Sequence, residues 1–163
     1  MKGVKAIISA TILTIVAVGQ IILSFVLYNK NGSNMVRNIG WIILMISAIF
    51  GWLPIFTFKK WGKPQGRGYI PTTVLVDRGI YAVVRHPQYL AGMLMALALP
   101  LIAQHWIVAI LGAIAIAIYY ENTFDEEKSA VEKFGEEYKR YRESVPRVNF
   151  FAGFVRLWLR RRK

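Results

Sequence analysis

The chain has 163 residues, which is enough for one domain. It is 55% hydrophobic with a mean hydropathy of +0.39, so it is too apolar for an ordinary soluble domain of this size. The absence of cysteine excludes disulfides, thiol catalysis and cysteine-ligated metals. A net charge of +12 is typical of proteins that meet nucleic acid or an anionic membrane, and the long apolar runs favour the membrane.

The first two predicted elements are apolar runs of membrane-spanning length, which we place at residues 4–28 and 37–58. Each holds about 20 residues, which at about 1.5 Å per residue crosses roughly 30 Å of hydrocarbon. A cleaved signal peptide is the alternative for the first run. Such a peptide has a shorter apolar core and a small-residue cleavage site. We therefore expect two retained transmembrane helices.

A third apolar stretch, residues 90–120, is too long for one span and contains two interruptions. Pro100 removes a helix donor and clashes with the preceding turn. Gln104-His105 is the only strongly polar pair in the stretch. These interruptions predict a helical hairpin over 88–102 and 105–122, with the histidine capping the turn. One long tilted helix is the alternative.

The positions of the basic residues support four spans. Lys30 and Arg37 flank the first loop, and the hairpin turn carries no Lys or Arg. Four spans then place 19 of the 21 basic residues on one side, which the positive-inside rule makes cytoplasmic. Three spans would separate the basic second loop, which includes Lys63 and Arg67, from the basic tail. We expect both termini to be cytoplasmic and residues 1–163 to form a single domain.

The tail after the last span is long and charged. Apolar residues recur in it at helical spacing, namely Ala130, Val131, Phe134, Tyr138, Tyr141 and Val145. This spacing predicts a cytoplasmic amphipathic helix over 124–144 that ends before Pro146. A second short segment, 150–158, sets aromatic residues beside the basic run 160–163, which suits a helix lying in the lipid interface. A basic tail that only fixes topology is the alternative.

The predicted fold is therefore all-α and polytopic. It has four transmembrane helices, the last two forming a hairpin, and a C-terminal amphipathic helix on the cytoplasmic side. Motifs of soluble enzymes are absent, and Gly66-Arg67-Gly68 is only an isolated turn signal. His86 and His105 are the only histidines, too few for a multi-histidine metal site, so we expect no metal.

The loop before the hairpin, residues 74–92, holds turn formers, two tyrosines, an arginine and a histidine. Pro87 suits the first helical position, where its missing N–H costs nothing. His86 then lies beside the positive end of a helix, which is a natural receptor for a carboxylate. The alternative is an interfacial belt that fixes membrane depth. After the last span, Glu126-Glu127 forms either a site for a cationic group or a solvated acidic turn.

Together these residues resemble a known family. The pattern is Leu75-Val76-x-x-Gly79-Ile80-Tyr81, Arg85-His86-Pro87-x-Tyr89-x-x-Gly92, a hydrophobic hairpin, Glu126-Glu127, Phe134-Gly135-x-x-Tyr138-x-x-Tyr141 and Val145-Pro146-Arg147. It resembles the isoprenylcysteine carboxyl methyltransferase family, whose wider group includes membrane phospholipid methyltransferases. The resemblance covers about residues 72–148, and the first two spans match only as hydrophobic segments.

The resemblance implies S-adenosylmethionine as cofactor and S-adenosylhomocysteine as product, with the pocket on the cytoplasmic side. Carried over, the cofactor-binding residues would be Leu75, Val76, Tyr81, Arg85, His86, Pro87, Tyr89, Gly92, Glu126 and Glu127. Carboxylates suit the ammonium of this cofactor, an arginine suits its carboxylate, and aromatic rings suit its adenine and sulfonium. Arg85 and Glu121 are the candidate catalytic residues.

One departure from the family concerns the methyl acceptor. Carboxyl methyltransferases of the family carry an arginine shortly before the Glu-Glu pair, whereas no Arg or Lys occurs here between Arg85 and Lys128. A carboxylate acceptor would meet Glu121 and Asp125, and like charges repel strongly in a dry site. An amine acceptor would be better served, because a carboxylate attracts an ammonium and takes its proton.

We therefore expect an integral membrane methyltransferase that acts on a lipophilic acceptor at the cytoplasmic face. The acceptor would be isoprenylcysteine carboxylate-like or phospholipid amine-like. Membrane lipids are the other expected partners, and no nucleic acid is expected. The alternative is a non-catalytic membrane scaffold whose basic tail binds anionic lipid or a partner. The sequence leaves the acceptor and the oligomeric state open.

Overall fold

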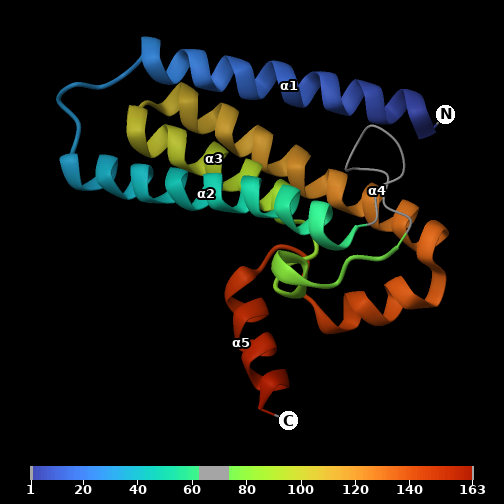
Figure 1. Cartoon of the computed structure of the whole chain (residues 1–163). Coiled ribbons are helices and arrows are strands. Elements are labelled where there is room, and N and C mark those ends of the chain that lie inside the picture. Colours follow the sequence, from blue (N-terminus) through green and yellow to red (C-terminus); the bar gives the residue numbers. More distant parts are fainter. Residues whose placement is uncertain (1, 63–73, 163) are drawn as a thin grey trace. The chain divides into compact units, whose positions relative to one another are not determined.

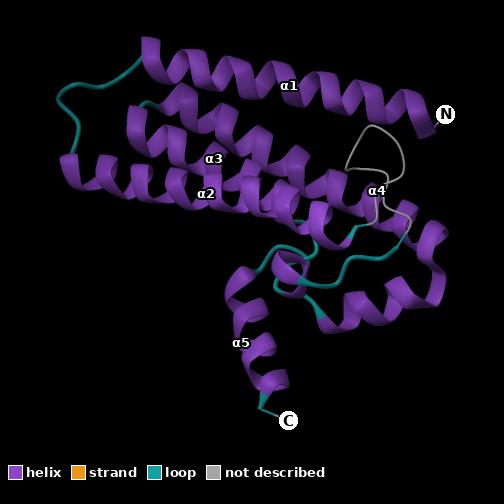
Figure 2. Cartoon of the chain, in the orientation of Figure 1, coloured by secondary structure: helices purple, strands orange, loops and turns teal. Residues whose placement is uncertain are grey.

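The computed structural model describes residues 2–62 and 74–162, which form five α-helices and a short 3-10 turn (Figure 1). The helices are α1 (Lys2–Val26), α2 (Asn34–Trp61), α3 (Pro87–Ala103), α4 (Trp106–Ser144) and α5 (Phe150–Arg161), and the turn is η1 (Gly79–Ala82). Figure 2 shows helices and loops without strands across the described ranges, which confirms the all-helical class. Lys63 and the Gly66–Gly68 turn signal lie outside the described residues.

Three helices, α1, α2 and α4, are long and apolar enough to cross a membrane. They expose large apolar side chains, such as Ile7 at 67%, Phe25 at 77% and Met45 at 69%. Lipid accommodates such surfaces, whereas water does not. The chain is therefore a multi-pass membrane protein. The count of four spans is not established, because α3 has 17 residues, about 26 Å, and is shorter than a typical span.

The chain divides into two compact units, which we describe separately. The first unit comprises Met1–Ala48 and Ala91–Asn122, and the second comprises Ile49–Leu90 and Thr123–Lys163. The first unit therefore holds α1 and most of the α3–α4 hairpin. The second holds the end of α2, the loop before α3, the end of α4, and α5. The expectation of a single domain stays a prediction.

The hairpin of the first unit turns at Gln104-His105, as predicted. Gln104 adopts a φ of 50° and ends α3. Its side chain accepts a hydrogen bond from the Ser33 amide at 2.8 Å and donates to the Ser33 carbonyl at 2.7 Å. His105 Nδ1 accepts from the Ile107 amide at 3.3 Å, so the histidine caps the start of α4. The sequence signal for the hairpin was therefore correct.

Pro100 does not interrupt α3, contrary to the sequence-based expectation. A proline lacks the N–H that would bond the carbonyl four residues earlier, which here belongs to Ala96. Gln20 of α1 supplies the missing donor, because its Nε2 donates to Ala96 O at 2.8 Å and to Val108 O at 3.2 Å. Gln20 is fully buried. A neighbouring span thus satisfies the freed carbonyl, and α3 continues to Ala103.

α4 runs from the hairpin into the tail without the predicted break after residue 122. The non-helical residue is Gly135, with φ 57° and ψ −131°, which glycine adopts readily because it has no Cβ. The helix predicted at 124–144 is therefore the C-terminal part of α4, kinked at Gly135. Its apolar face is confirmed, because a buried cluster joins Leu75 to Ala130, Val131, Phe134, Tyr138, Tyr141 and Val145.

In the second unit, hydrogen bonds connect the loop before α3 to the segment that follows α4. The Arg85 amide donates to Pro146 O at 3.1 Å, and the His86 amide donates to Arg147 O at 3.2 Å. The Tyr141 hydroxyl donates to Tyr81 O at 2.7 Å. These bonds hold the Arg85-His86-Pro87 segment against the end of the tail. Pro87 is the first residue of α3, as predicted.

Candidate functional site

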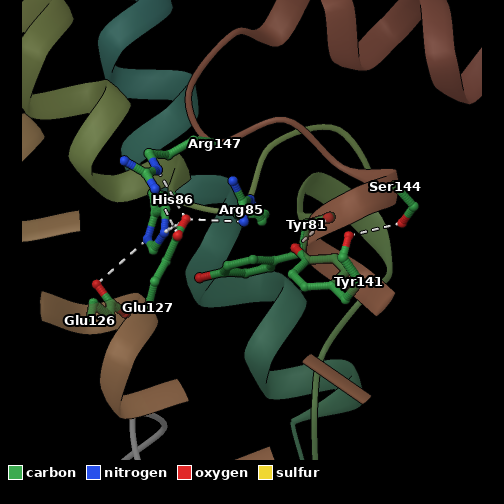
Figure 3. Close-up of polar contacts among 8 residues, drawn as sticks. All are labelled: Tyr81, Arg85, His86, Glu126, Glu127, Tyr141, Ser144 and Arg147. Carbon is green, nitrogen blue, oxygen red and sulfur yellow. Dashed lines mark hydrogen bonds and ion pairs between the residues drawn. The ribbon is translucent and has the colours of Figure 1, made fainter. Parts of the chain in front are cut away.

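Glu127 is the centre of a buried polar cluster in the second unit (Figure 3). Its Oε1 lies 3.1 Å from Arg85 Nη1 and 3.2 Å from His86 Nε2. Arg147 donates from Nε to Oε1 at 3.0 Å and from Nη2 to Oε2 at 2.8 Å. The Glu127 side chain is 8% exposed, and a carboxylate so buried is stable only with such partners. One carboxylate therefore ties the loop before α3 to the segment after α4.

The cluster keeps Glu127 ionised and favours the charged form of His86. Burial acts to raise the pKa of Glu127, but hydrogen bonds from His86 and Arg147 and the Arg85 charge outweigh it and lower the pKa to about 2. Burial acts to lower the pKa of His86, yet its bonds with Glu126 and Glu127 raise that pKa above its ordinary value. The cluster thus holds an ionised Glu127 beside two arginines, and its carboxylates favour the charged form of His86.

Arg85 lies between this cluster and a cavity. Its side chain is 9% exposed, and burial lowers the pKa of Arg85, although a guanidinium remains charged in a protein. Within the described parts of the chain, its Nε and Nη1 have no hydrogen-bond partner of good geometry, even though Nη1 forms the ion pair with Glu127. The Glu127 carboxylate is the counter-charge of this guanidinium, which also lines the cavity.

The cavity of the second unit has a volume of about 290 Å³. Its aromatic wall consists of Phe58, Tyr81, Tyr89, Phe134, Tyr138 and Tyr141, and its polar side chains are Arg85, His86, Gln88, Glu126, Ser129 and Lys133. Burial raises the pKa of Tyr138 to about 12 and raises the pKa of Tyr81 and Tyr141 as well. These phenols are therefore neutral at neutral pH. The cavity combines aromatic walls with the buried polar side chains of Arg85 and His86.

Glu126 supplies a carboxylate at this cavity. Its side chain is 52% exposed, in contrast to Glu127, and its Oε2 lies 3.7 Å from His86 Nδ1. A solvated carboxylate next to a cavity can bind a cationic ligand without a large desolvation cost. The two neighbouring glutamates are therefore not equivalent, since one is enclosed by cations and the other faces the cavity.

Most of the sequence-predicted site residues lie on this cavity, namely Leu75, Val76, Tyr81, Arg85, His86, Pro87, Tyr89 and Glu126. Three others are not among its described lining residues. Glu127 belongs to the buried cluster. Glu121 is exposed on α4 in the first unit. Gly92 also lies in the first unit, where a Cβ would collide with the Tyr119 ring. Close packing against Tyr119 thus requires a glycine at this position, and its assignment to cofactor binding stays a prediction.

The sequence placed Arg147 and the aromatic residues of the tail in the family pattern but assigned none of them a role in the site. Arg147 follows Glu127 by twenty residues, and only the fold pairs them. Its guanidinium also lies 3.7 Å from the Phe124 ring centroid. Phe134 and Tyr138 were recognised as part of an apolar helix face, but helical spacing does not identify what the face packs against. Phe58 was counted as an ordinary residue of a span.

The fold and the cavity define a class, a multi-pass membrane protein whose second unit contains a cavity lined by aromatic and charged side chains. Within that class the family is clear. Residues 35–137, more than half of the chain, match the phospholipid methyltransferase family, and the chain belongs to it. The resemblance seen in the sequence is confirmed at the level of this family.

Two curated relatives are methyltransferases by name. The chain is 32% identical over 74 residues to a protein-S-isoprenylcysteine O-methyltransferase of Schizosaccharomyces pombe. This aligned segment covers 45% of this chain and 31% of that protein. It is 29% identical over 113 residues to a methanethiol S-methyltransferase of Pseudomonas deceptionensis, which covers 66% of this chain and 40% of that protein. The chain thus spans well under half the length of either relative. No solved structure matches it.

Proposed function

We propose that the chain is a membrane methyltransferase that binds S-adenosylmethionine in the cavity of the second unit and methylates a lipophilic acceptor. The observation that carries the proposal is the buried Arg85 guanidinium on the cavity. This guanidinium is a buried cation on the cavity wall, and it also forms an ion pair with Glu127. A guanidinium forms strong charge-assisted hydrogen bonds with carboxylates, so it suits a carboxylate-bearing ligand.

The residues on the cavity fit the charges of this cofactor. Arg85 would bind its carboxylate, and the half-exposed Glu126 would bind its ammonium. Aromatic rings such as Phe134 and Tyr138 would lie against the adenine and the sulfonium. Glu127 is already shared by three cationic side chains. We therefore assign Glu127 to positioning Arg85 and His86, and Glu126 to binding.

When bound, the cofactor would supply an electrophilic methyl group on a sulfonium and would leave as S-adenosylhomocysteine. The contribution of the chain is mainly alignment, because methyl transfer is an in-line displacement. Arg85 and Glu126 would fix the two charged groups of the amino-acid moiety, and the apolar wall would keep water away. For an amine acceptor, Glu121 stays our candidate for the group that takes the proton.

For the acceptor we propose an amine of phospholipid type ahead of an isoprenylcysteine carboxylate. No Arg or Lys occurs between Arg85 and Lys128, and this segment carries Glu121 and Asp125. Lys133 does line the cavity, so carboxylate acceptors belong in the same test. We further propose four spans, counting α3, with the cavity and both termini on the cytoplasmic side, because this topology gathers 19 of the 21 basic residues there.

The test is transfer of labelled methyl groups from S-adenosylmethionine by the full chain in lipid nanodiscs. The acceptors are phosphatidylethanolamine, a farnesylated cysteine and a small alkyl thiol. We expect labelled phosphatidylethanolamine, a raised cofactor KM for Glu126→Gln, and unchanged kinetics for the exposed control Glu143→Gln. Transfer only to the prenylcysteine or the thiol would overturn the acceptor class. Failure to transfer to any acceptor and to bind S-adenosylhomocysteine would overturn the enzymatic proposal itself.

A further inference from the structure

α5 carries a row of large apolar side chains that the protein does not cover. Phe151, Phe154, Val155 and Trp158 follow the spacing i, i+3, i+4, i+7, which places them on one face of a helix. Their exposed fractions are 71%, 53%, 56% and 52%. We call these four residues the exposed stripe. In water such a stripe would promote aggregation, so an apolar phase or partner must cover it.

The other side of α5 is fixed to the second unit. The Phe150 ring packs against the Phe50 ring of α2, with centroids 5.5 Å apart. Gly153 lies so close to the Val83 carbonyl that a Cβ would collide with it. The Asn149 side chain accepts from the Ala152 amide at 3.0 Å and caps the helix. These contacts hold the stripe outward, so it cannot be buried by rotating the helix.

The contact with Phe50 places the start of α5 alongside a candidate span. Phe50 precedes Lys59, the first of two lysines at the end of α2, by nine residues, or about 13 Å of helix. The outward side chains of this part of α2, Ile49, Trp52 and Phe56, are apolar and 54–63% exposed, as expected for a surface in lipid. The lipid that surrounds α2 at this level therefore also reaches α5.

α5 is too short to cross a bilayer, because its 12 residues extend about 18 Å and a span needs about 30 Å. A short helix with an apolar stripe and basic residues on its other faces lies in the plane of the interface. Arg156 and Arg162 are exposed. The Arg162 guanidinium lies 3.5 Å from the Trp158 ring centroid, which couples a cation to an aromatic ring at the edge of the stripe.

We propose that α5 is an in-plane membrane anchor whose exposed stripe enters the acyl boundary and whose arginines bind anionic lipid head groups. Charge favours this occupant over a second copy of the chain, because two basic α5 helices facing each other would repel. Through the contact of Gly153 with Val83, the anchored helix also steadies the loop that carries Arg85 and His86. This role does not depend on the proposed methyl transfer.

The chain has no cysteine, so single cysteines can be introduced and spin-labelled without a background signal. We would label Phe151→Cys, Phe154→Cys and Trp158→Cys on the stripe, with Arg156→Cys as the matched control on a polar face. Full-length protein in nanodiscs of phosphatidylcholine with about 30% phosphatidylglycerol would be probed with oxygen, which enters lipid, and a nickel chelate, which stays in water. We expect the stripe labels to be oxygen-accessible and nickel-protected, and the control label to show the reverse.

Two outcomes would overturn the proposal. Stripe labels as accessible to nickel as the control would place α5 in water. Stripe labels protected from both reagents would show a protein cover, such as a second copy of the chain. Because the stripe is exposed, these substitutions leave the packed side of α5 unchanged, and an unaltered thermal midpoint would verify that the fold is intact.

The head-group part of the proposal has its own test. The double variant Arg156→Gln/Arg162→Gln is compared with Arg140→Gln/Arg142→Gln, which removes the same charge from exposed positions of α4. Each double variant carries the spin label at Phe154→Cys in nanodiscs that contain phosphatidylglycerol. The ratio of label embedded in lipid to label exposed to water should fall about fivefold for each of Arg156 and Arg162 that is removed. The α4 variant should keep the ratio of the unmodified chain. An equal ratio for both variants would contradict binding of anionic head groups by α5.

Discussion

At Glu126 and Glu127, two adjacent residues of the same type differ because of helix geometry. Successive side chains of an α-helix point about 100° apart, so one can face the interior while the next faces a cavity. Glu127 faces Arg85, His86 and Arg147, whereas Glu126 remains half exposed at the cavity. The pair therefore separates an enclosed structural charge, Glu127, from Glu126, the charge that we propose binds a ligand.

Replacement of Glu127 by alanine would leave the buried Arg85 and Arg147 without their shared carboxylate. We expect Glu127→Ala to lower the free energy of unfolding by about 3–5 kcal/mol, the usual loss when one member of a buried ion pair is removed. Denaturant titration of the detergent-solubilised chain measures this change. The control is Glu143→Ala, an exposed glutamate on the same helix, which should change stability by less than about 0.5 kcal/mol. Equal losses for the two variants would contradict the central position of Glu127.

The raised pKa of His86 predicts that the stability of the folded chain depends on pH. Its pKa is raised in the folded protein above the ordinary 6.5, because Glu126 and Glu127 favour the charged ring over the opposing effect of burial. The stabilisation is therefore fully present below pH 6.5 and is lost as the pH rises through the raised pKa. Thermal midpoints between about pH 6 and pH 9 should fall for the unmodified chain and fall less for His86→Asn. His105→Asn is the control, and a slope lost equally in both variants would refute the assignment.

The residue types of the site could be predicted from the sequence, but their pairing could not. Arg85, His86 and Glu126 stand in recognisable local patterns, and all three line the cavity. Arg147 also stands in the family pattern, but the pattern does not give its partner, because Glu127 lies twenty residues away and the pairing depends on how the tail folds back. Gly92 is the opposite case. It has a clear signal in the motif, and the structure shows that it packs closely against Tyr119.

Among the elements, α3 shows how a side chain of one helix can offset the effect of a helix-breaking proline in another. Proline disfavours a helix mainly through the carbonyl it leaves unbonded, and Gln20 of α1 bonds that carbonyl of Ala96. The hydrophobic runs predicted the bounds of α1, α2 and α3 closely, because apolar composition over about 20 residues is a strong signal, whereas α4 continues past the predicted end to Ser144. The continuity of α3 past Pro100 depends on a tertiary contact, which no local pattern contains.

This contact can be measured with a double-mutant cycle. Gln20→Leu should destabilise the chain by about 1 kcal/mol, because the Ala96 carbonyl loses its donor inside an apolar environment. Pro100→Ala restores a backbone N–H four residues after Ala96, so the cost of Gln20→Leu should shrink in that background. Free energies of unfolding in detergent micelles provide the four values. Strict additivity of the two substitutions would show that Gln20 does not compensate for Pro100.

For the whole molecule, the four-span topology makes a prediction that cysteine labelling can test. The loop between α1 and α2 should lie on the opposite side of the membrane from the loop before α3 and the tail. We expect Asn31→Cys to react with an impermeant maleimide from the extracytoplasmic side, and Asp77→Cys and Glu143→Cys from the cytoplasmic side. All three positions are exposed, and the chain has no cysteine of its own. Labelling of Asp77→Cys and Glu143→Cys from opposite sides would exclude this topology.

The central claim is that Arg85 holds the carboxylate of S-adenosylmethionine in the cavity of the second unit. Titration calorimetry with S-adenosylhomocysteine tests it when paired with methylthioadenosine, which has the adenosine thioether but no amino-acid carboxylate. We expect Arg85→Gln to weaken S-adenosylhomocysteine binding about 10- to 100-fold, the loss typical of a charged hydrogen bond, and to leave methylthioadenosine binding nearly unchanged. Arg78→Gln, an exposed arginine of the same loop, should alter neither affinity. Absence of binding by the unmodified chain, or equal losses for both ligands in Arg85→Gln, would contradict the account.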